Sequence, residues 1–194
     1  MEQTLPASTP RSKMNLPNRL TIFRMLLVPL MVVVFSFDAW LPGWNYYAAA
    51  IFFIADMTDI LDGYIARKRN LVTNFGKLMD PMADKLLFCT AYIMLCSTGR
   101  VSGLLTVVFV ARELIISAFR LVAVEKGVVI AAGKLGKLKT LLQCFSIVLL
   151  LLDNPLFRLI GVPMDQIVTY LAALFTVWSC VDYIIKNRNL VSTK

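Results

Sequence analysis

Long apolar stretches separated by short polar segments constrain this chain more than any other feature of its sequence. Hydrophobic residues occupy 58% of the 194 positions, which is more than an ordinary soluble domain contains. Several stretches approach the roughly 20 apolar residues that a helix needs to cross a bilayer. We therefore expect an all-α integral membrane bundle of about six transmembrane helices, over approximately residues 20–38, 45–67, 78–98, 102–125, 138–152 and 164–186.

The distribution of Lys and Arg predicts how these helices are oriented. Basic residues gather near the N-terminus, around 67–77 and 126–139, and in the C-terminal tail, whereas the alternate turns contain only Arg100 and Arg158. Cytoplasmic segments of membrane proteins are enriched in Lys and Arg, so we expect both termini on the cytoplasmic side. The net charge of +8 then reflects orientation and anionic substrates, and the absence of a basic–aromatic motif argues against nucleic-acid binding.

Composition also limits the domain organisation and the available chemistry. Residues 1–13 are polar and rich in Pro, Ser and Thr, and we expect them to form a disordered extension. Residues 14–194 contain no polar stretch long enough for a second domain, so a single membrane domain is expected. Histidine is absent, which excludes imidazole bases and His-ligated metals. The four cysteines lack metal-type spacing and are expected to be packing residues.

Four carboxylates lie at helical spacing between residues 59 and 84. Asp59 and Asp62 are separated by three positions, and Asp80 and Asp84 by four, so each pair shares one helix face. A charge in the middle of a bilayer costs about 2.5–3.5 kcal/mol, so these acids require a partner. Hard divalent cations bound through oxygen are one possibility. Ion pairs with nearby basic residues are the alternative, from Arg67, Lys77 and Lys85.

The same segment carries a motif with eight fixed positions. It reads D-x2-D-G-x2-A-R-x8-G-x3-D-x3-D from Asp59 to Asp84 and resembles the signature of the CDP-alcohol phosphatidyltransferases at every fixed position. Residues 15–24, 111–120 and 136–140 further resemble a bacterial subgroup of that family, the phosphatidylglycerophosphate synthases (CDP-diacylglycerol–glycerol-3-phosphate 3-phosphatidyltransferases). The resemblance covers about residues 14–190.

This resemblance implies a homodimeric enzyme of the bacterial cytoplasmic membrane whose active site faces the cytoplasm and uses two Mg2+ or Mn2+ ions. It implies four metal ligands, Asp59, Asp62, Asp80 and Asp84. Asp84 would also be the general base. It further implies a CDP pocket formed by Gly63, Ala66, Arg67 and Gly76. Asp56 lies one turn before Asp59, outside the motif, and is expected to be a supporting or solvated acid.

Basic residues on the fourth helix and after it are candidates for binding the phosphate of the acceptor alcohol, since Arg and Lys are the usual phosphate partners. They are Arg112, Arg120, Lys137 and Lys139. Two alternatives remain open for them. Arg112 and the adjacent Glu113 would form an isolated ion pair in the membrane, and the lysines would only anchor the chain at the cytoplasmic face.

These features together predict transfer of a phosphatidyl group from CDP-diacylglycerol to sn-glycerol 3-phosphate, with release of CMP. Such transfer requires mainly positioning and cations near the developing phosphate charge, which two carboxylate-bound ions would provide. The same chemistry with inositol phosphate, phosphatidylglycerol or serine as acceptor is an alternative. A divalent-cation transporter that uses the four carboxylates as a relay is a second one.

Overall fold

In a computed structural model of the chain, the described residues are 16–68, 74–126 and 133–188, without the side chains of 16–17, 60–68, 74–78, 134 and 156. These residues form six long helices, one short helix and no strand. The helices are α1 (Leu16–Ser36), α2 (Trp44–Lys68), α3 (Asn74–Ser97), α4 (Gly103–Glu125), α5 (Lys134–Leu151), α6 (Pro155–Arg158) and α7 (Met164–Lys186). The expected all-α class is confirmed, whereas the expected extension over residues 1–13 lies outside the described residues.

Three helices begin about four residues earlier than the sequence indicated, and one of them is α1, which starts at Leu16 rather than near 20. Helix α3 starts at Asn74 rather than near 78, and α5 starts at Lys134 rather than near 138. Both early turns contain a glycine and a lysine, which suggested loops. Lysine is a good helix former, and a single glycine costs only about 1 kcal/mol, so the flanking helix continues through these positions.

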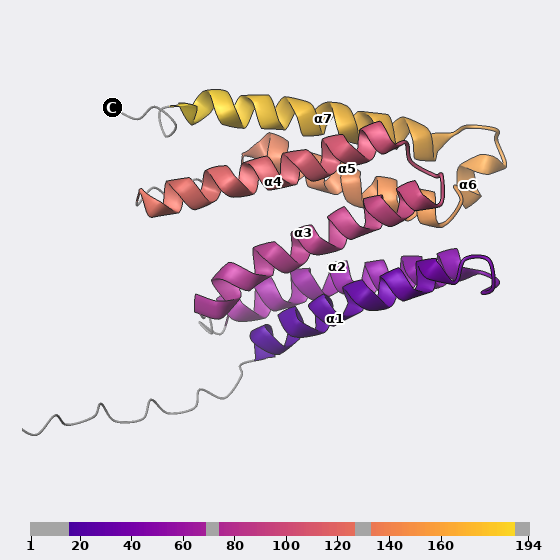
Figure 1. The fold of residues 1–194 in the computed structure, drawn as a ribbon, viewed down its shortest axis with the longest axis horizontal. Coiled ribbons are helices and arrows are strands. Elements are labelled where there is room, and N and C mark those ends of the chain that lie inside the picture. The colour runs from indigo at the N-terminus through magenta and orange to yellow at the C-terminus, as the bar shows by residue number, and fades with distance from the viewer. Residues whose placement is uncertain (1–15, 69–73, 127–132, 189–194) are drawn as a thin grey trace, which may run out of the picture.

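The six long helices run alternately up and down the bundle (Figure 1). Helices α1, α2 and α3 pack together, α7 packs against α4 and α5, and α3 also contacts α4 and α5. Helices α2, α4 and α7 end, and α1, α3 and α5 begin, at one end of the bundle, on the left in Figure 1. We call this the basic end, because the Lys- and Arg-rich segments of the sequence connect these helix termini.

The interior joins these helices through small, aromatic and hydroxyl side chains. Ala48 and Ala55 of α2 are fully buried, and such small residues let neighbouring helices approach closely. The rings of Tyr92 in α3 and Phe109 in α4 stack with centroids 4.1 Å apart. Between α5 and α7, the hydroxyl oxygens of Ser146 and Thr169 lie 2.7 Å apart in a buried hydrogen bond. Both aromatic packing and buried hydrogen bonds therefore fix the register of the bundle.

The opposite end of the bundle is tied together by Arg100, in the turn between α3 and α4. Its guanidinium donates to the carbonyl oxygen of Leu150, in the last turn of α5, and lies 3.2 Å from a carboxylate oxygen of Asp153. It also stacks 4.9 Å from the ring centroid of Trp44. A cation at a helix C-terminus satisfies carbonyls that have no partner within the helix. Arg100 therefore has a structural role at this otherwise base-poor end.

The outer surface of the bundle is also apolar. Leu104, Leu121 and Leu174 are each more than half exposed, and exposed apolar surface of this extent marks contact with lipid or protein. Among the described residues, two helical segments are long and apolar enough to cross a membrane by themselves, Asn18–Ser36 and Met164–Lys186. The remaining long helices also carry charged residues, several of which line the site described next.

Candidate active site

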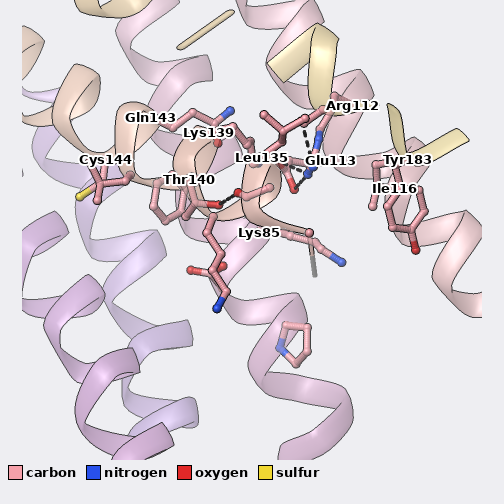
Figure 2. A pocket seen from close by; sticks show the side chains of 18 of the residues that line it. Lys85, Arg112, Glu113, Ile116, Leu135, Lys139, Thr140, Gln143, Cys144 and Tyr183 are labelled. Atoms are coloured by element: carbon pink, nitrogen blue, oxygen red, sulfur yellow. Dashed lines mark hydrogen bonds and ion pairs between the residues drawn. The ribbon is translucent and has the colours of Figure 1, made fainter. Parts of the chain in front are cut away.

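Five helices enclose a cavity of about 520 Å3 near the basic end of the bundle (Figure 2). Its lining comes from α2, α3, α4, α5 and α7, so it exists only in the folded bundle. Most site residues that the sequence predicted and whose side chains are described line this one cavity. They are Asp59, Asp84, Arg112, Arg120, Lys137 and Lys139.

One part of the cavity wall carries carboxylates from α2 and α3. Asp56 and Asp59 are three residues apart on α2, and Asp84 lies on α3. The side chain of Asp59 is 40% exposed. Asp80, one turn before Asp84 on α3, is not a lining residue. Two neighbouring helices thus bring acids of separate sequence pairs to one cavity, whereas their spacing predicted only that each pair shares a helix face.

Helix α1 supplies polar partners to two of these acids. The guanidinium Nη1 of Arg24, which is fully buried, lies 2.6 Å from Oδ1 of Asp59. The hydroxyl of Thr21 donates to Oδ1 of Asp80. Asp84 makes no hydrogen bond or ion pair with another described side chain, so its carboxylate lines the cavity without a partner among those side chains.

Whether these acids suit a metal ion depends on the kind and number of oxygen donors. Carboxylates of Asp59 and Asp84 facing one cavity are the hard donors that Mg2+ and Mn2+ prefer. Among the described side chains, no group of three or more His, Cys, Asp or Glu is close enough to hold an ion. The predicted ligand Asp62 lies outside the described side chains. The described donors fit a hard cation in type, and the full four-residue ligand set stays a prediction.

Another part of the wall carries cations from α4 and α5. Arg112 and Arg120 come from α4, and Lys137 and Lys139 come from α5, so two consecutive helices bring the four predicted residues to one cavity. Lys85 of α3 also lines the cavity. The sequence had suggested Lys85 as a counter-ion for the acids, but no described acid is within ion-pair distance of it. Cations and carboxylates therefore line one cavity together, and Lys85 directly follows Asp84 on α3.

Glu113 holds two of these cations in place. Its side chain is buried and accepts from the ammonium of Lys139, which is 4% exposed. Its Oε1 also lies 3.2 Å from Nη1 of Arg112. Although Arg112 and Glu113 are adjacent on the helix, the long arginine side chain folds back to its neighbour. Their contact is not an isolated ion pair, because Lys139 shares the same carboxylate (Figure 2).

Helix α7 contributes lining residues that the sequence analysis did not identify. Ser179, Asp182 and Tyr183 are at positions i, i+3 and i+4, which places them on one helix face. The hydroxyl of Ser179 accepts a hydrogen bond of 3.4 Å from Nη2 of Arg112. Asp182 is ion-paired at 2.8 Å with Lys186 on its own helix. The sequence does contain a signal for them, because three polar residues at helical spacing near the end of an apolar helix indicate a polar face.

A family model described as CDP-alcohol phosphatidyltransferase matches residues 14–178. The chain belongs to this family. The match begins before α1 and ends within α7, so it includes both the carboxylates and the cations of the cavity. The chain is accordingly an enzyme.

Several curated relatives of this CDP-alcohol phosphatidyltransferase have the same name, CDP-diacylglycerol–glycerol-3-phosphate 3-phosphatidyltransferase. One from Bacillus subtilis is 39% identical over 190 residues, which cover 92% of this chain and 98% of the relative. One from Rickettsia typhi is 37% identical over 87% of this chain and 94% of the relative. One from Haemophilus influenzae is 36% identical over 89% and 92%, respectively.

The predicted CDP-binding positions of this CDP-alcohol phosphatidyltransferase have no described side chains. Gly63, Ala66 and Arg67 lie in the last turns of α2, and Gly76 lies in the first turn of α3. Their backbones are helical, and they lie at the basic end of α2 and α3, the two helices that carry Asp59 and Asp84. Their role stays a prediction.

Proposed function

We propose that this enzyme transfers the phosphatidyl group of CDP-diacylglycerol to sn-glycerol 3-phosphate and forms phosphatidylglycerol phosphate and CMP. The observation that carries this proposal is one cavity that is lined both by the carboxylates of Asp59 and Asp84 and by cations of α4 and α5. Carboxylates suit metal-assisted attack on a diphosphate, whereas the cations suit a phosphorylated acceptor. The names of the relatives support the same pair of substrates.

In the proposed reaction, a primary hydroxyl oxygen of glycerol 3-phosphate attacks the β-phosphorus of CDP-diacylglycerol. The new P–O bond forms as the bond to the CMP oxygen breaks, and the hydroxyl proton passes to the carboxylate of Asp84. Asp84 is suited to accept it, because Asp59 and Asp80 are engaged by Arg24 and Thr21. General base catalysis of this kind contributes about 10²- to 10⁴-fold to the rate.

The proposed metal ligands are Asp59, Asp62, Asp80 and Asp84. Two Mg2+ or Mn2+ ions, when bound, would neutralise the charge that develops on the diphosphate oxygens. The ion pair between Arg24 and Asp59 gives part of the same compensation to the apoprotein, because a carboxylate in a bundle of this kind requires a cationic partner.

The cations are proposed to orient the acceptor. Arg112, Arg120, Lys137 and Lys139 line the cavity, and guanidinium groups bind phosphate oxygens with two parallel hydrogen bonds. With the phosphate held there, the hydroxyl of a three-carbon acceptor can extend toward Asp84. Orientation of this type removes much of the entropic part of the barrier.

We also propose that the six long helices span the bacterial cytoplasmic membrane, with the basic end on the cytoplasmic side. The apolar exterior of the bundle and the separation of basic residues between its ends support this placement. A cavity near one membrane face can receive a lipid headgroup while its acyl chains stay in the bilayer. The homodimer stays a prediction.

The test uses purified enzyme in detergent–lipid micelles with CDP-diacylglycerol and a panel of acceptors: glycerol 3-phosphate, inositol phosphate, serine and phosphatidylglycerol. We expect CMP release that depends on glycerol 3-phosphate. Arg120→Ala should raise the KM for glycerol 3-phosphate about 10- to 100-fold, because a charge-assisted hydrogen bond is lost, and leave the KM for CDP-diacylglycerol unchanged. Arg158→Ala, at the opposite end of the bundle, is the matched control. Equal turnover with a non-phosphorylated acceptor would contradict the proposed substrate.

A further inference from the structure

Tyr183 of α7 contributes a polar atom that the reaction as proposed does not use. Its ring lines the cavity, beside Ile116 and on the side where Arg112 and Glu113 lie (Figure 2). Its hydroxyl is buried and has no hydrogen-bond partner within the part of the chain that the structure describes. Buried hydroxyl groups in folded proteins are nearly always hydrogen-bonded, so an orphaned one that lines a cavity indicates a ligand.

The orientation of this ring is fixed by apolar packing rather than by its hydroxyl. The ring of Tyr183 meets the ring of Phe119 edge to face, with centroids 6.4 Å apart and an interplanar angle of 84°. Such pairs are stabilising without any polar contact. The ring is therefore held in place by a contact that a phenylalanine would preserve.

Arg120, the residue after Phe119, also has a buried polar atom without a hydrogen-bond partner among the described residues. Nε of Arg120 is buried without a hydrogen-bond partner among the described residues, and so is Nε of Arg112. Both arginines line the cavity together with Tyr183. An arginine Nε can only donate, and a tyrosine hydroxyl can donate as well. Two helices, α4 and α7, thus present three unpaired donors, and the ligand that satisfies all of them carries several acceptor oxygens.

We infer that Tyr183 donates a hydrogen bond to a phosphate oxygen of the acceptor, beside Arg120, and that it helps the enzyme to select a phosphorylated alcohol. This inference rests on the proposed function and extends it to α7, which supplies neither carboxylate nor cation to that mechanism. Asp182, the adjacent residue, is already ion-paired with Lys186. The acceptor phosphate is favoured over the diphosphate of CDP-diacylglycerol because Tyr183 lines the cavity together with Arg112 and Arg120, two of the residues proposed to bind that phosphate.

The test is Tyr183→Phe, which removes the hydroxyl and keeps the ring against Phe119. Tyr170→Phe is the matched control, because Tyr170 is on the same helix but 61% exposed. A hydrogen bond to a charged group is lost, so the KM for glycerol 3-phosphate should rise about tenfold or more. The KM for CDP-diacylglycerol should stay within about twofold of the wild type. The preference for glycerol 3-phosphate over glycerol, as a ratio of kcat/KM values, should fall by a similar factor.

Binding gives a second measurement that does not depend on turnover. Glycerol 3-phosphate should raise the unfolding temperature of the wild type and of Tyr170→Phe more than that of Tyr183→Phe at equal concentration. An unchanged KM for glycerol 3-phosphate in Tyr183→Phe, or a rise confined to CDP-diacylglycerol, overturns the inference. A wild type without acceptor-dependent CMP release overturns the proposed function instead, so the two failures are distinguishable.

Discussion

Replacement of Glu113 by Gln tests whether one carboxylate organises the cations of the cavity. Glu113 accepts from Lys139, which is 4% exposed, and pairs with Arg112 at 3.2 Å. In the variant, Lys139 becomes a buried ammonium without its carboxylate, and removing one partner of a buried ion pair typically costs about 3–5 kcal/mol. Arg112 loses less, since it also donates to Ser179. We therefore expect Glu113→Gln to destabilise the protein by about 3–5 kcal/mol.

The assay is thermal unfolding of purified protein in one detergent, followed by intrinsic fluorescence. For a chain of this length, about 1 kcal/mol corresponds to roughly 2–4 °C, so the unfolding temperature should fall by roughly 6–20 °C. Lys186→Ala provides the matched control, because it breaks the exposed pair with Asp182 and should cost about 1 kcal/mol or less.

A double variant separates the unpaired charge from the loss of packing. Lys139→Met in the Glu113→Gln background removes the buried ammonium as well, and apolar replacement of a buried pair is often neutral. The double variant should therefore be more stable than Glu113→Gln alone. An unfolding temperature of Glu113→Gln within 2 °C of the wild type, or a double variant less stable than either single one, would refute the assigned role of Glu113.

Three further outcomes follow from the carboxylate wall. Asp84→Asn should lower kcat by about 10²-fold or more at an unchanged unfolding temperature, because it removes the proposed base; kinetics that match the wild type would contradict that role. Chelation should abolish CMP release and Mg2+ or Mn2+ should restore it, whereas activity that persists in chelator would contradict the metal requirement. Arg24→Met removes the partner of Asp59, so Mg2+ should raise the unfolding temperature of this variant more than that of the wild type; equal shifts would contradict the compensating role of Arg24.

The sequence predicted the helices well, because apolar length and charge alternation are local properties of the chain. The expected last helix, 164–186, coincides with α7, Met164–Lys186. The starts of α3 and α5 were placed too late, at 78 and 138, because Gly and Lys near a helix start do not by themselves indicate whether neighbouring helices stabilise another turn. Boundaries of this kind depend on tertiary packing.

The candidate site was predictable only in part, for the same reason. Helical spacing indicated that Asp59 and Asp84 would lie on site-forming faces, and the structure places both in one cavity. The pairing of Arg24 with Asp59 and of Lys139 with Glu113 depends on how separate helices are aligned, which periodicity does not contain. Tyr183 was missed because a single tyrosine in an apolar helix is ordinarily a packing residue.

The most direct measurement is the product balance of the purified enzyme, with CDP-diacylglycerol labelled in its acyl chains and in its cytidine. In the presence of Mg2+ or Mn2+, we expect labelled phosphatidylglycerol phosphate and CMP to form in equal amounts, and only when glycerol 3-phosphate is added. CMP that forms without a matching lipid product, or no CMP under these conditions, would contradict phosphatidyl transfer to glycerol 3-phosphate.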